Sequence, residues 1–142
     1  MKKSLKRTLA LVVSVCAICA SGLAANASDD NHPYAYNIKA YNAPTYTNEN
    51  YYRQTDSTDN RWKVNLQYST EGTGDKMTFW MATWNSSHTV VTAKQTITQG
   101  SGAHYYNPYS SANHKTLCLG MCNNNWSSDT WRISGYWDEE VW

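Results

Sequence analysis

The chain has 142 residues, with twelve Lys and Arg, eleven Asp and Glu, and a formal net charge of +1 at pH 7. Four of the basic residues stand within the first seven positions, so the rest of the chain is mildly acidic. This distribution disfavours a nucleic-acid-binding domain, because neutralising phosphates requires a cluster of Lys and Arg.

The first 27 residues are predicted to form a cleaved signal peptide. A basic segment (residues 2–7) precedes a mostly apolar stretch from Thr8 to Ala20, and Ala25 and Ala27 supply the small residues that a signal peptidase requires. Cleavage after Ala27 leaves residues 28–142, a single domain of 115 residues with eight basic and eleven acidic side chains, and therefore a formal charge of −3. We expect this domain to be secreted.

Two other interpretations of the leader are weaker. A membrane anchor needs about 20 apolar residues, and the 13 residues from Thr8 to Ala20 fall short of that length. A lipidated cysteine is usually preceded by a small residue, whereas Cys16 and Cys19 follow Val15 and Ile18. We therefore expect no membrane span.

The predicted mature domain is rich in aromatic residues and poor in aliphatic ones. It contains all seven Trp, all eleven Tyr and the single Phe79 of the chain. Each buried ring removes about 150 to 250 Å² from water, so rings can supply the core that aliphatic residues do not. Abundant Thr favours strands, and abundant Asn and Ser favour turns.

Short runs bounded by turn residues predict about eight strands. The predicted strands are 34–41, 51–54, 62–69, 76–84, 89–98, 103–106, 115–121 and 130–136. No segment has a clear helical period. This pattern predicts an all-β fold, an antiparallel β-sandwich of the jelly-roll-like or Ig-like kind.

The clearest strand signal is the alternation from Trp62 to Ser69. Trp62, Val64, Leu66 and Tyr68 would share one face, and the polar residues between them would share a solvated face. The glycine-rich turn 71–75 would connect this strand to the next one as a hairpin.

Several short phrases carry a family resemblance: Tyr52-Arg53-Gln54-Thr55, Trp62-Lys63-Val64-Asn65-Leu66, Gln99-Gly100-Ser101-Gly102-Ala103 with Tyr105-Tyr106-Asn107, and Ser134-Gly135-Tyr136-Trp137-Asp138-Glu139-Glu140. Together they resemble a family of small uncharacterised secreted proteins, a domain of unknown function, from Gram-positive bacteria. The resemblance covers most of the predicted mature chain. It implies export and a bacterial source, and it implies no activity or site.

Cys118 and Cys122 are the cysteines of the predicted mature domain. In one regular strand their Cα atoms would lie about 13 Å apart, beyond the roughly 7 Å that a disulfide tolerates. A turn at Gly120 would allow a small disulfide loop, which export favours. Two free thiols are the alternative, and a catalytic or metal-binding role is the weakest interpretation.

Trp80 and Trp84 carry the first binding hypothesis. If Met77, Phe79 and Met81 face the core, Trp80 and Trp84 share the opposite face of their strand. Exposed indoles on a sheet can stack against the apolar face of a sugar ring. The alternative is a central strand buried on both faces.

Two loop regions carry the second binding hypothesis. Tyr105 and Tyr106 stand near one predicted loop and Trp126 in another that begins with three asparagines. Loops often carry binding residues, and aromatic loop residues offer a large contact area at a low entropic cost. The alternative is that these rings fold back and cap the core.

No pattern indicates catalysis, a metal site or a cofactor. The acidic run of residues 138–140 is predicted to lie in solvent near the chain end rather than to form a glycosidase pair. The segment 100–102 lacks the nucleophile-elbow pattern, the turn 71–76 lacks phosphate-loop spacing, and the four histidines lack metal-ligand spacing.

The sequence thus predicts a secreted, non-catalytic protein that acts by surface recognition. The favoured function is an extracellular binding module for cell-wall glycan or another envelope component. The alternative is a secreted antimicrobial or toxin-like protein that acts on a competitor's envelope. The oligomeric state is not indicated.

Overall fold

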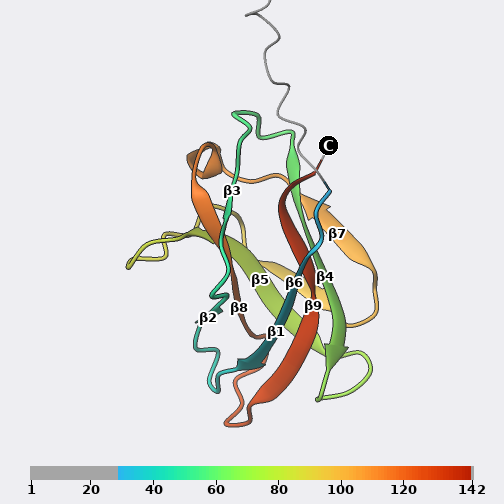
Figure 1. The fold of residues 1–142 in the computed structure, drawn as a ribbon. Coiled ribbons are helices and arrows are strands. Elements are labelled where there is room, and N and C mark those ends of the chain that lie inside the picture. Colours follow the sequence, from blue (N-terminus) through green and yellow to red (C-terminus); the bar gives the residue numbers. More distant parts are fainter. Residues whose placement is uncertain (1–28, 142) are drawn as a thin grey trace, which may run out of the picture.

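The computed structural model describes residues 29–141 (Figure 1). The predicted signal peptide and Trp142 lie outside the described residues. The strands are β1 (His32–Ile38), β2 (Thr45–Tyr46), β3 (Tyr51–Tyr52), β4 (Arg61–Ser69), β5 (Lys76–Thr83), β6 (Gln95–Thr98), β7 (Ala103–Tyr106), β8 (Thr116–Asn123) and β9 (Trp131–Val141). A single turn of 3₁₀ helix, Ser110–Ala112, precedes β8.

The strands form two antiparallel sheets, which confirms the predicted all-β sandwich. One sheet has the order β1-β9-β4-β7. The other has the order β2-β8-β5-β6, and β3 pairs with β8 beside β2. Among the described residues, no helix is long and apolar enough to cross a lipid bilayer.

The core lies between the sheets and combines aromatic, aliphatic and methionine side chains. Trp62, Val64, Leu66 and Trp137 contribute from the first sheet. The second sheet contributes the alternate residues of β5 and β8, which are Met77, Phe79, Met81, Leu117, Leu119 and Met121. Met77, Phe79 and Met81 thus face the core, which is the condition that places Trp80 and Trp84 on the opposite face of β5.

The predicted alternation of β4 is right for its first half only. The pairing of β4 with β9 shifts register between Leu66 and Tyr68, and such a bulge moves the following residues to the other face. Tyr68 is 51% exposed and Ser69 is buried. The face predicted to be solvated is also partly covered, because Lys63 and Asn65 are buried.

The acidic run at the end of β9 is buried, so its predicted solvent exposure is wrong. Asp138 lies 3.8 Å from the Lys63 ammonium and accepts a hydrogen bond from the Asp30 amide. Glu140 accepts hydrogen bonds from the backbone amides of Gln54 and Thr55. The run is buried because cations and amides from other segments satisfy its carboxylates.

Candidate functional site

Three loops meet at the end of the sandwich shown at the bottom of Figure 1. They are 39–44 between β1 and β2, 70–75 between β4 and β5, and 124–130 between β8 and β9. The Tyr41 amide donates a hydrogen bond to the Ser127 carbonyl oxygen at 2.8 Å. The Asn42 side-chain amide, oriented as a donor, bonds the carbonyl oxygens of Asn123 and Asn125. We call this region the loop end.

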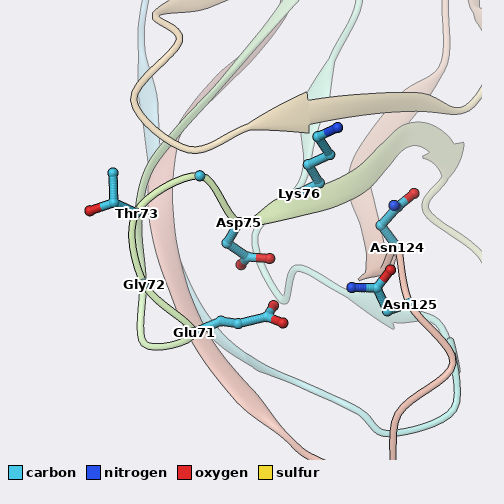
Figure 2. Close-up of a pocket in the computed structure, with 8 residues that line it drawn as sticks. Glu71, Gly72, Thr73, Asp75, Lys76, Asn124 and Asn125 are labelled. Carbon is cyan, nitrogen blue, oxygen red and sulfur yellow. The ribbon is translucent and has the colours of Figure 1, made fainter.

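A polar pocket of ≈ 410 Å³ lies at the loop end, between the 70–75 turn and the 124–130 loop (Figure 2). Its lining residues are Glu71, Gly72, Thr73, Gly74, Asp75, Lys76, Asn124 and Asn125. Gly72 and Gly74 have φ angles of 116° and 89°. These conformations suit glycine, and they fold the turn so that Glu71 and Asp75 lie on the same side of it (Figure 2).

The two carboxyl groups of this pocket interact directly. A hydrogen bond to Asp75, then burial and the negative charges of Asp75 and Asp129, raise the pKa of Glu71 to about 7. Asp75 is only 8% exposed, and its Oδ2 atom has no hydrogen-bond partner. The ion pairs that form within residues 29–141 lie elsewhere, around Lys63 and Glu139. The pocket therefore presents negative charge without a bound counter-charge from the described chain.

An aromatic pair borders the same loops. Trp126 is 76% exposed and Tyr41 is 51% exposed. Their ring centroids lie 5.4 Å apart with an interplanar angle of 48°, a separation typical of interacting aromatic rings. The pair joins the 39–44 loop to the 124–130 loop and leaves both rings accessible to solvent.

Residues 20–141 match the family described as a protein of unknown function, DUF2712. The chain belongs to this DUF2712 family. The predicted resemblance to a domain of unknown function is thereby confirmed. No curated protein and no solved structure matches the chain.

The predicted pair of Trp80 and Trp84 does not form a flat binding face in the DUF2712 protein. Trp80 is 1% exposed, because Tyr46 packs edge-on against its ring and the Lys94 ammonium lies 4.4 Å from the ring centroid. Trp84 is 42% exposed. The alternative, a central strand whose two faces are both buried, is therefore right at Trp80. It is wrong at Trp84, which remains exposed.

Trp84 borders a second, smaller pocket. This pocket of ≈ 320 Å³ is lined by Trp84, Asn85, Ser86 and His88. The imidazole of His88 stacks on Tyr46 at a centroid distance of 4.1 Å. The eight residues of β5 separate this pocket from the loop end, a length of about 26 Å, so the two regions can be tested separately.

Tyr105 and Tyr106 lie at a third place, on edge strand β7. Tyr105 is 43% exposed, with the Arg61 guanidinium 5.2 Å from its ring centroid. Tyr106 is partly buried and packs against Trp62 at 5.7 Å. Of the five predicted ligand-binding residues, Trp126 is the one that belongs to a loop lining the polar pocket, where it directly follows Asn124 and Asn125.

The structure has the alternative arrangement of two free thiols in place of the predicted disulfide loop. Cys118 and Cys122 are free, buried thiols within the continuous strand β8. Gly120 does not turn the chain, because it pairs with Trp80 across β5 and β8. A side chain at position 120 would overlap the Trp80 indole, so the glycine makes room for the ring instead.

The acidic pocket is not predicted from the sequence. Glu71 and Asp75 were assigned to a plain turn, and their position opposite Asn124 and Asn125 depends on pairing between strands distant in sequence. Two acidic residues flanking a Gly-X-Gly turn were the available signal. A second acidic group, formed by His32, Asp138 and Glu139, has its ligand atoms within 4.8 Å of one another, but Lys63 already lies 3.8 Å from Asp138.

Proposed function

We propose that this protein is a secreted, non-catalytic binding module that recognises cell-wall glycan through its loop end. The observation that carries the proposal is the exposed pair of Trp126 and Tyr41, in which Trp126 directly follows the pocket-lining residues Asn124 and Asn125 in the chain. Ligand sites commonly combine aromatic contact surfaces with a few polar groups that fix orientation.

The chemistry of a sugar ring suits this combination. The C–H face of a pyranose can stack on an exposed indole, and its hydroxyl groups can bond to amides and carboxylates nearby. Tyr41 and Trp126 are held together by the hydrogen bond between Tyr41 and Ser127, so less freedom is lost when a ligand orders them. Asn125 offers a side-chain amide that forms no hydrogen bond within the described chain.

The charge of the loop end favours one class of wall polymer. Glu71 and Asp75 line the pocket and the negative charge of Asp129 lies near Glu71. These carboxylates repel phosphate groups and attract hydroxyl and amino groups. Peptidoglycan fragments are therefore the expected ligand in preference to teichoic acid.

Two further observations support binding over the other candidate functions. Glycoside cleavage uses carboxyl groups at least about 5 Å apart, whereas the Asp75 side chain is close enough to Glu71 to be the main cause of its raised pKa. The exposed large apolar residues, including Tyr68, Trp84 and Trp126, are dispersed over β4, the end of β5 and the 124–130 loop. An envelope-disrupting protein would instead be expected to gather such residues in one contiguous apolar patch.

The test is a titration of the mature protein with peptidoglycan fragments and, separately, teichoic acid, monitored by tryptophan fluorescence. Trp126→Ala should weaken binding of peptidoglycan fragments by about tenfold or more, since a central aromatic contact often contributes over 1 kcal/mol. Trp84→Ala is the matched control, because it removes another exposed indole at the far end of β5. It should leave the affinity unchanged.

Two results would overturn the proposal. If neither wall preparation shifts the fluorescence or retains the protein in a pull-down, the protein is not a glycan-binding module. If Trp84→Ala abolishes binding and Trp126→Ala does not, the recognition surface is the smaller pocket beside β5. Killing of competitor cells by the purified protein without wall binding would favour the antimicrobial alternative.

A further inference from the structure

The 70–75 turn holds two carboxyl groups in a fixed position. The Asp75 amide donates to the Gly72 carbonyl at 3.2 Å, and the Asp75 carbonyl accepts from the Gln99 amide at 2.8 Å. The Glu71 amide donates to Ser69 Oγ at 3.2 Å. Both acidic residues are thus anchored through their backbones, and their side chains need little reordering to bind a ligand.

Asp75 has a side-chain oxygen that the described chain does not satisfy. The residue is 8% exposed, and Oδ2 is buried without a hydrogen-bond partner. Buried polar atoms in native proteins are nearly always bonded, so an orphaned carboxylate oxygen calls for a partner. Figure 2 shows Asp75 and Glu71 pointing into the space between the turn and Asn125.

The neighbouring lysine does not supply this partner. Lys76 lines the same pocket, but its side chain points away from the two carboxylates (Figure 2). No Lys or Arg nitrogen of residues 29–141 lies within 4.0 Å of Glu71 or Asp75. A positive charge from outside the described chain is therefore the natural complement of the pair.

We propose that the loop-end pocket binds a divalent cation, Ca²⁺ in particular, through Glu71, Asp75 and Asn125. Each of these side chains presents oxygen atoms, and Ca²⁺ takes six to eight oxygen ligands, including backbone carbonyls and waters. The pocket of ≈ 410 Å³ leaves room for those waters. None of its lining residues is His or Cys, so the donor set does not suit Zn²⁺.

Asn125 is the amide available to the ion. The side-chain oxygen of Asn124 lies 3.4 Å from the Thr96 hydroxyl and 3.5 Å from the Thr78 hydroxyl, so it is already engaged with the adjacent strands. The backbone N–H of Asn125 donates a hydrogen bond to Asn123 Oδ1 at 2.9 Å. That bond fixes the Asn125 backbone while its side chain remains free to turn its oxygen toward the carboxylates.

The test is calorimetric titration of CaCl₂ into chelator-treated mature protein, together with thermal unfolding with and without 10 mM Ca²⁺. We expect a Kd of about 10⁻⁴ to 10⁻³ M, as in other extracellular calcium modules, and a rise in Tm of about 5 to 15 °C. Glu71→Gln, at an exposed position, and Asp75→Asn should each weaken binding about tenfold or more. Asp59→Asn, which removes an exposed carboxylate in the segment between β3 and β4, should not.

Three results would overturn the cation site. These are no Ca²⁺ heat and no Tm shift, an equal Tm shift with NaCl of the same ionic strength, or an equal loss of affinity in Asp59→Asn. Because Glu71→Gln changes one atom of an exposed side chain, misfolding does not confound it. The inference does not rest on glycan recognition, since Ca²⁺ binding is tested on the free protein. A bound ion would offset the negative charge of Glu71 and Asp75, so the preference for peptidoglycan over teichoic acid applies to the ion-free protein, and the stacking role of Trp126 is tested independently of the ion.

Discussion

A glycine at position 120 explains how a tryptophan can be buried on the outer face of a sheet. Trp80 and Gly120 are direct partners in the β5–β8 pairing, and the indole occupies the volume that a side chain at 120 would need. Tyr46 and Lys94 complete the cover. Neither cover residue could be identified from the sequence, because both belong to segments far from β5 along the chain.

Gly120→Ala should therefore destabilise the fold by about 1 to 3 kcal/mol, the usual cost of overpacking a filled site. Urea unfolding of the two proteins measures the difference. In a Trp80→Leu background the same substitution should cost markedly less, because the ring that it meets is gone. An equal cost in both backgrounds would mean that Gly120 acts through the backbone and not through Trp80.

The two cysteines should behave as inert thiols in the native protein. Burial raises the pKa of Cys118 to about 11, and it also raises the pKa of Cys122. Since the thiolate is the reactive form, iodoacetamide at pH 8 should label neither residue in the folded protein and both in urea. A mature protein that takes up no label in urea without a reductant would indicate the disulfide loop.

At the scale of the strands, the local sequence pattern predicts that a strand is present better than it predicts where the strand begins and ends. The boundaries of β4, β5 and β7 agree with the prediction to within one residue at each end, because alternation and glycine turns mark them. The two-residue strand β2 was missed, since it is defined only by its pairing with β8. The end of β9 was missed because three adjacent acidic residues suggest solvent, and partners from elsewhere reverse that preference.

The contact between β4 and β9 contains a buried cation that should be important for stability. Lys63 is 1% exposed, bonds Asp29 and lies 3.8 Å from Asp138. Burial lowers the pKa of Lys63 and raises that of Asp138. Lys63→Met should cost about 3 to 5 kcal/mol, because it leaves the Asp138 carboxylate buried without a cation.

Chemical unfolding at several pH values can separate this cost from lost packing. In Lys63→Met the folded-state pKa of Asp138 rises further, so the stability of the variant should be greater in acid and should fall as the pH rises through that pKa. The added substitution Asp138→Asn should restore part of the loss. Lys115→Met, at an exposed lysine, is the control. If the loss of unfolding free energy in Lys63→Met is the same at every pH and Asp138→Asn does not restore any of it, Lys63 has no electrostatic role.

At the scale of the whole molecule, the sandwich brings together side chains that the sequence keeps apart. Glu71 and Asp75 stand about 50 residues before Asn124 and Asn125, and Tyr41 stands 85 before Trp126. Trp126 could be nominated from its loop composition alone. Tyr41, Glu71 and Asp75 could not be assigned to the same site from the sequence, because their position depends on which loops share one end of the sandwich. That arrangement follows from the order of the strands in the sheets, which strand patterns do not reveal.

Nuclear magnetic resonance of the indole N–H groups tests most directly whether the loop end is the recognition surface. The protein has seven tryptophans, each with one indole N–H signal, and Trp126→Ala and Trp84→Ala assign the two that matter. On addition of peptidoglycan fragments, the Trp126 signal should shift progressively to saturation while the Trp84 signal stays in place. A shift of Trp84 with Trp126 unchanged, or no shift of either at saturating fragment, would contradict the proposed binding surface.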